Sequence, residues 1–206
     1  MTTQDAEVMT PHKKAACQQL TPLGQRLFKY VEFDEDETIL AEVHKHPIGL
    51  AFIWLTGGFI TAAIVLSVLM VTNTSLLTNL GVSSSTSFNV LALFICLITS
   101  VLVFIATAVS AFIYKSSTIF VTSDKTAEVV YKSLFNRQVR QLGIGNVEDV
   151  TVIQKGILPR LFHFGDIIVE TAGENQSPDF TTIPNPNVTS QIIIKAHEAY
   201  VEKFGN

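Results

Sequence analysis

The chain has 206 residues, of which 48% are hydrophobic, and its formal net charge is −4. An acidic balance gives no support to nucleic-acid binding, which is typically marked by a basic surface. The cysteines, Cys17 and Cys96, fall in regions of different character, so a disulfide framework is excluded. No cofactor or metal motif stands out, and the composition has to be read region by region.

Between His46 and Lys115 there is no Asp, Glu, Lys or Arg, and this interval contains two long apolar runs at 47–71 and 88–114. About 20 apolar residues are enough to cross the roughly 30 Å hydrocarbon layer of a bilayer as a helix. The first run follows an acidic cluster rather than a short basic leader, which argues against a cleaved signal peptide. We therefore predict a transmembrane hairpin over 47–114, with a loop at 72–87.

The flanking charges predict how this hairpin is oriented. Lys45 precedes the first span, Lys115 and Lys125 follow the second, and the loop carries no charge. Lys and Arg collect on the cytoplasmic side of membrane proteins. We expect a multi-pass protein of the cell membrane with both termini cytoplasmic and the loop 72–87 outside.

Small side chains recur at four-residue spacing inside both spans, where they permit close helix packing. They either form the seam of the hairpin or reflect the ordinary abundance of small residues in membrane helices. The sets are Gly58 with Ala62, Ala92 with Cys96 and Ser100, and Ala106 with Ser110.

Residues 1–46 are predicted to be a cytoplasmic N-terminal segment that is partly disordered. From Leu20 to Val43 apolar residues alternate irregularly with charges, which indicates a short ordered element of either type. The acidic run 34–37 is interpreted as a solvated face rather than a metal site, because four adjacent carboxylates do not converge on one ion without a loop built for it. His44 and His46 lack an evident third ligand.

Residues 115–206 have the alternating pattern of a small antiparallel β domain. Turn residues separate the expected strands. A helix is expected after Pro186, with an apolar stripe that covers the sheet. The strands are predicted at 118–122, 127–133, 137–142, 147–154, 164–171 and 180–183, and the stripe comprises Val188, Ile192, Ala196, Tyr200 and Phe204.

Five short motifs in fixed order follow the two spans: Tyr-Lys at 114–115, Ile-Gly-Asn-Val-Glu-Asp-Val at 144–150, Leu-Pro-Arg-Leu-Phe at 158–162, Gly-Asp-Ile at 165–167 and Ile-Pro at 183–184. Over about residues 35–204 the chain resembles the bacterial YdbS-like pleckstrin-homology (PH) domain proteins. The resemblance implies an α+β membrane protein, in which a two-helix transmembrane hairpin is followed by a PH-like antiparallel β-barrel capped by a C-terminal α-helix. Members of that family have no established catalytic activity, so the resemblance implies a protein that is not an enzyme.

The chain departs from that family after Thr122, where relatives have an Asn followed by a basic residue and this chain has Ser123-Asp124-Lys125. Inositide-binding PH domains cluster Lys and Arg at this turn, so inositide binding is not carried over. We predict instead a basic surface that faces anionic lipid headgroups or a protein partner. Its candidate residues are Lys115, Lys125, Lys132, Arg137, Arg140, Lys155 and Arg160.

Two functions fit these patterns. The first is a membrane-anchored binding module, which docks a protein segment or a lipid headgroup at the cytoplasmic face of the bilayer. The second is a scaffold or accessory subunit of a larger complex of membrane proteins. No nucleophile with an adjacent base is evident, and an enzyme is not expected.

Overall fold

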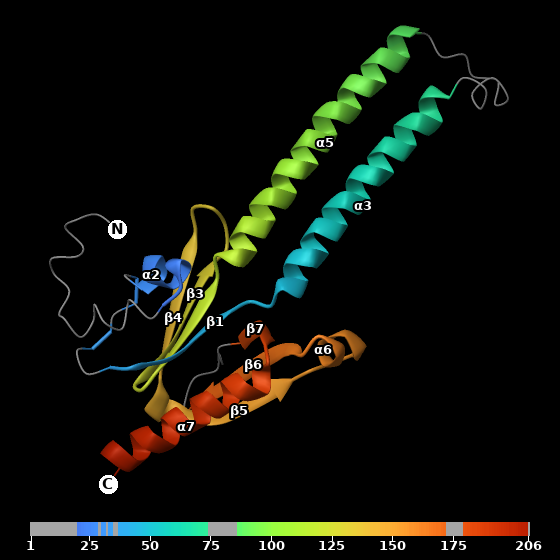
Figure 1. Ribbon diagram of the computed structural model, residues 1–206. Helices are drawn as coiled ribbons and strands as arrows, with labels where there is room; N and C mark the ends of the chain where they lie inside the picture. Colours follow the sequence, from blue (N-terminus) through green and yellow to red (C-terminus); the bar gives the residue numbers. More distant parts are fainter. Residues whose placement is uncertain are drawn as a thin grey trace, which may run out of the picture. The chain divides into compact units, whose positions relative to one another are not determined.

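The computed structural model describes residues 20–28, 30–31, 33–34, 37–73, 86–171 and 179–205. The expectations for residues 1–19 and for most of the loop 72–87 lie outside these ranges. Contacts divide the chain into two compact units (Figure 1). One, the helical unit, is Ile48–Phe112; the other, the sheet unit, joins the residues up to Pro47 to those from Ile113 onward.

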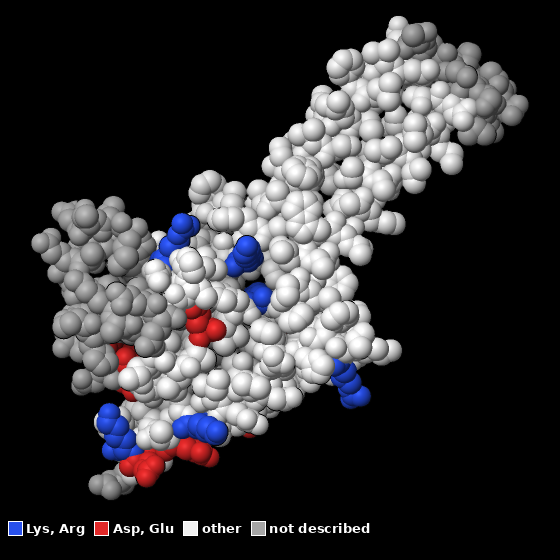
Figure 2. All heavy atoms as spheres, in the orientation of Figure 1, with Lys and Arg blue, Asp and Glu red and all other residues white. Residues whose placement is uncertain are grey.

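Two long helices, α3 (Pro47–Thr72) and α5 (Thr86–Lys115), are long and apolar enough to cross a membrane by length and composition. Few of their residues are buried, and large apolar side chains such as Leu55, Phe59 and Phe94 are exposed. On the face drawn in Figure 2, no blue or red spheres appear along the two helices before the end of α5, whose last residue is Lys115. The core helix of a soluble protein would instead be mostly buried.

Gly57 and Thr107 form a close contact between the two helices. Gly57 is buried, and a Cβ added there would collide with the Thr107 side chain. Of the two interpretations of the small residues, the seam therefore does not hold for Gly58, which has nothing near its Cβ position, or for Ala106, which is exposed. Adjacent residues on a helix point about 100° apart. Contact through Gly57 rather than Gly58 therefore means that a different face of α3 packs against α5.

Four antiparallel strands form the first sheet of the sheet unit. They are β1 (Ile39–His44), β2 (Thr118–Thr122), β3 (Lys125–Tyr131) and β4 (Arg137–Gly143), in the order β1-β2-β3-β4. His44 pairs with Thr118. The segment before the helices therefore supplies an edge strand to a sheet that is otherwise built from residues after them.

Three antiparallel strands form the second sheet: β5 (Val147–Ile153), β6 (Phe164–Thr171) and β7 (Asp179–Pro184), in the order β5-β6-β7. The 3-10 helix η1 (Ile144–Asn146) leads from β4 into β5, and α6 (Ile157–Leu161) lies between β5 and β6. The expected barrel is corrected to two sheets, because η1 ends the ladder of the first sheet before the second begins. Among the described strands no pairing closes them into a barrel.

Each face of the first sheet covers a core. Between the two sheets lie buried side chains that include Ile119, Val121, Ile167 and Val169. On the other face, Phe120 and Val129 pack against the segment that contains α2 (Pro22–Phe28), where Phe28 stacks on Phe33. In β6, Ile167 and Val169 are buried while Glu170 is exposed, as the alternation predicted.

The C-terminal helix α7 (Pro186–Phe204) covers the core between the sheets, where the predicted Ile192, Ala196 and Tyr200 pack, but the two ends of the predicted stripe do not. Ile193 is 0% exposed, whereas Val188 is 57% and Phe204 58% exposed. A strict four-residue step drifts by about 40° each time on a helix of 3.6 residues per turn, so the ends of such a stripe leave the packed face. The most deeply buried line runs through Thr189, Ile193 and Ala196.

Candidate functional site

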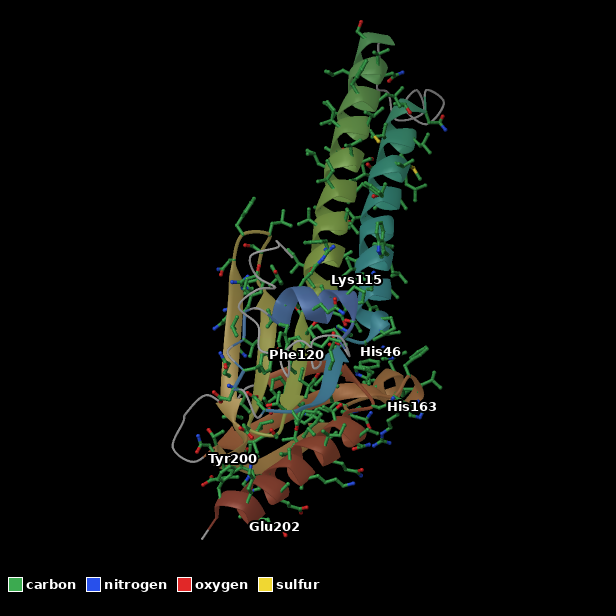
Figure 3. The ribbon with its side chains drawn as sticks, turned by 60° about the vertical axis from the view of Figure 1, so that its left-hand side comes forward. His46, Lys115, Phe120, His163, Tyr200 and Glu202 are labelled. Atoms are coloured by element: carbon green, nitrogen blue, oxygen red, sulfur yellow. The ribbon has the colours of Figure 1, made fainter. Side chains whose placement is uncertain are left out.

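The strand register separates two ends of the sheet unit. At one end, which we call the hairpin end, β1 finishes at His44 and β2 begins at Thr118, next to the two connections to the helices. At the other, the distal end, lie the start of β1, the β2–β3 turn and the β4–β5 connection. Figure 3 shows His46 and Lys115 toward one end of the unit and Tyr200 and Glu202 toward the other.

The predicted basic residues do not form one continuous surface. Lys125 begins β3 at the distal end. Its Nζ lies 3.2 Å from Glu37 Oε2 and 3.6 Å from Asp34 Oδ2, and its side chain is largely buried. Lys125 therefore forms ion pairs within the sheet unit. Its role as a binding residue stays a prediction.

The pairing also corrects the interpretation of the acidic run. Glu37 is 4% exposed, and it accepts a hydrogen bond from the Thr122 hydroxyl in addition to the contact with Lys125. Asp34 is exposed, as expected of a solvated face. Glu37 instead fixes the segment before β1 against the β2–β3 turn.

Arg137 and Arg140 point to opposite faces of the first sheet, as their odd spacing predicted. The Arg137 guanidinium lies 3.4 Å from the ring centroid of Tyr30, on the face covered by α2. Arg140 Nη1 lies 3.7 Å from Oε2 of the buried Glu128 on β3. The two arginines therefore cannot bind the same ligand together.

The remaining basic residues lie at the hairpin end. Lys115 ends α5, and Lys132 follows β3 in the turn before β4. Lys155 and Arg160 lie in the connection between β5 and β6 that contains α6. All four are exposed.

His46 and Tyr114 fix the hairpin end of the second sheet to the chain that leads into the helices. The His46 backbone N–H donates to the Thr182 carbonyl at 2.7 Å, and the Tyr114 hydroxyl donates to the His46 carbonyl at 2.8 Å. The His46 ring stacks on Phe164 with centroids 5.3 Å apart. Burial lowers the pKa of His46 below its ordinary value of 6.5.

A groove of about 480 Å³ lies at the distal end, between the start of β1 and the C-terminal half of α7. Its size falls in the range of protein binding pockets, and most of its wall is apolar. Tyr200 and Phe204 form an aromatic pair along α7 with centroids 4.8 Å apart. The lining residues are Thr38, Leu40, Ser123, Asp124, Ile192, Lys195, Ala196, Ala199, Tyr200, Lys203 and Phe204.

The described histidines do not gather into a metal site. Among the residues that the structure describes, no group of three His, Cys, Asp or Glu side chains could hold a metal ion. His44 bonds through its two ring nitrogens to Thr21 and Thr118, and His197 Nδ1 lies 2.8 Å from the Ile144 carbonyl oxygen. These histidines hold elements together.

The groove is the feature that sequence reasoning missed. The sequence did signal an apolar helix face through Ile192, Ala196 and Tyr200, and an apolar Leu40 before the first span. What it lacked was the pairing of β1 with β2, which brings Leu40 to the same end of the unit as α7.

Comparison with known proteins gives one match, to the family model described as Bacterial PH domain, over residues 38–196. No curated protein and no solved structure matches the chain. The matched range begins just before β1 and ends within α7, so it takes in both sheets and both long helices. PH domains are generally non-catalytic binding modules, and this chain belongs to the bacterial PH domain family.

Proposed function

We propose that this protein is a membrane-anchored PH module of the YdbS-like kind, which docks a protein segment at the cytoplasmic face of the cell membrane. In this proposal α3 and α5 span the bilayer and both termini are cytoplasmic. The single observation that carries the docking function is the apolar groove at the distal end of the sheet unit. Its position leaves it open to a cytoplasmic partner while the opposite end connects to the helices.

The membrane placement is supported by composition and exposure together. The two helices expose large apolar side chains around their length, which is unfavourable in water and favourable in lipid. Lys45 and Lys115 flank the helices on the side of the sheet unit. The excess of positive charge there favours a cytoplasmic location for that unit.

The chemistry of the groove favours one kind of occupant. Leu40, Ala196 and Ala199 offer apolar surface, and Lys195 and Lys203 on α7 supply positive charge against the single carboxylate of Asp124. We therefore propose that the groove takes a short protein segment with apolar side chains flanked by Asp or Glu. Burial of the apolar side chains supplies affinity, and the lysines select the acidic flank.

Site-specific photo-crosslinking in intact cells tests this function. A photoreactive residue at Ala199, inside the groove, is compared with one at Thr151, which is exposed on β5. We expect a protein adduct from position 199 alone, with the crosslinked peptide carrying acidic residues beside an apolar one. Lys195→Glu with Lys203→Glu should abolish the adduct. Equal labelling from the two positions would reject the groove as the site.

A scaffold or accessory-subunit role is the second candidate, and the exposed apolar faces of α3 and α5 favour it. In that case the outward-facing Leu66 or Phe94 should crosslink to another membrane protein. Position 199 would then give no adduct.

A further inference from the structure

Two exposed turns of the sheet unit carry large apolar side chains where turns normally carry small or polar ones. In the turn 133–136, Leu134 and Phe135 occupy the two central positions, and Phe135 is 99% exposed. Gly, Asn, Asp, Ser and Pro dominate such positions in water-facing turns. Bonds from Asn136 N–H to the Ser133 hydroxyl and carbonyl hold the backbone of the turn closed.

The connection that contains α6 repeats this arrangement. Ile157 is 84% and Leu161 64% exposed, and Phe162 follows in the same segment. Gly156, with φ at 105°, turns the chain sharply into α6 in a conformation that favours glycine. Gly156, Ile157, Arg160 and Leu161 line an open hollow of about 620 Å³.

Both turns lie at the hairpin end. Thr118, the first residue of β2, pairs with Val129, and β3 continues past Val129 to Tyr131. Those two further residues carry the β3–β4 turn about 7 Å beyond the start of β2, toward the level of Lys115. The α6 connection ends at Phe164, against which the His46 ring stacks one residue before α3 begins.

Exposed cations flank both turns. The exposed Lys132, Lys155 and Arg160 lie in or beside these two turns. Acidic residues such as Asp124, Glu148 and Glu202 lie toward the distal end. Each turn therefore combines exposed apolar side chains with neighbouring cations, which suits the interface of an anionic leaflet. There the apolar side chains enter the boundary of the acyl chains, and the cations contact the lipid phosphates.

We propose that the β3–β4 turn and the α6 connection insert into the headgroup region of an anionic phospholipid bilayer. This contact holds the sheet unit against the membrane and keeps the distal groove facing the cytoplasm. The inference rests on the membrane placement of α3 and α5 in the proposed function. Its ligand is the lipid surface itself, which neither the family match nor the groove assigns.

Depth-dependent fluorescence quenching of the full-length protein tests it. Single-cysteine variants are made in a background with Cys17→Ser and Cys96→Ser, labelled with bimane, and reconstituted into phosphatidylethanolamine–phosphatidylglycerol vesicles that contain nitroxide lipids. Phe135→Cys and Ile157→Cys probe the two turns, and Glu148→Cys is the control on the distal part of β5. Val65→Cys, on an exposed face of α3, reports whether the helix is in the bilayer.

Labels at 135 and 157 should be quenched several-fold more strongly than the label at 148 by a nitroxide at headgroup depth. Lys132→Glu, Lys155→Glu and Arg160→Glu together should remove most of that difference, and so should phosphatidylcholine vesicles. Quenching at 135 and 157 no stronger than at 148 overturns the inference, and insensitivity to charge reversal overturns its electrostatic part. If the label at 65 escapes a deep nitroxide, the membrane placement itself fails, which separates the two proposals.

Discussion

Glu37 and Lys125 form a buried ion pair, with Nζ 3.2 Å from Oε2, that joins the segment before β1 to the first residue of β3. The Glu37 side chain is completely inaccessible, and the Lys125 side chain is 16% exposed. Asp34 N–H and the Thr122 hydroxyl donate to the same carboxylate. This one carboxylate therefore organises the distal end, next to the proposed groove.

Removing only the cation should destabilise the sheet unit. Lys125→Met leaves the Glu37 charge buried without its ion-pair partner, and we expect a loss of about 3 kcal/mol in unfolding free energy. Glu37→Gln with Lys125→Met should recover much of the loss, because the buried charge is then gone. Near-UV circular dichroism during denaturant unfolding in micelles measures this. A loss of less than about 1 kcal/mol in the single variant would contradict the buried-pair interpretation.

The packed face of α7 gives a second prediction. Ile193 is fully buried between the sheets, so Ile193→Ala should cost about 2–5 kcal/mol through lost burial and a residual cavity. Val188→Ala, on an exposed position of the same helix, should change stability by no more than about 0.5 kcal/mol. The same denaturant titration measures both variants, and equal effects would mean that the helix is rotated from the described position.

Local alternation predicted most of the strands of this fold from sequence. Thr118–Thr122 and Phe164–Thr171 were placed at the residues where the structure has them, because alternate side chains enter a core. β1 remained ambiguous because the register shift between Ile39 and Ala41 breaks the alternation. A bulge adds a residue that the period-two pattern cannot anticipate.

The candidate site was harder to predict because it depends on contacts between distant segments. Nothing near Lys125 in sequence indicates that Glu37 holds it, and nothing near Leu40 indicates that α7 lies beside it. The sequence shows a net positive charge in residues 115–160. Which of these cations lie at the same end of the sheet unit is decided by the strand register, which the sequence does not show. The division into domains at 1–46, 47–114 and 115–206 stays a prediction. The contacts in the structure group β1, which lies in the first of these regions, with the strands of the third.

The two adjacent glycines of α3 give a matched test of the helical unit. Gly57→Leu should lower its thermal stability in micelles, because the new side chain occupies the space of the Thr107 side chain. Gly58→Leu should leave the transition unchanged, since nothing lies near its Cβ position. Thermal scans followed by far-UV circular dichroism compare the two, and equal sensitivity would place the helix contact on a different face.

His46 predicts a pH dependence for the sheet unit. Burial lowers its pKa in the folded protein below the ordinary 6.5, so below pH 6.5 the unfolded chain binds more protons at this site than the folded chain. Its contribution to stability is therefore fully present above pH 6.5 and is lost as the pH falls toward the folded pKa. His46→Phe preserves a ring against Phe164 but removes the titrating group.

The difference between the wild type and His46→Phe isolates this group, because the other histidines titrate in both proteins. We expect the unfolding free energy of the wild type to fall relative to that of the variant as the pH drops from about 7 to about 5. Denaturant titrations at intermediate pH values measure the gap. A difference between the two free energies that stays constant would mean that the His46 ring has the same affinity for protons in the folded and unfolded chains, and a rise of the wild type relative to the variant on acidification would reverse the sign of the shift.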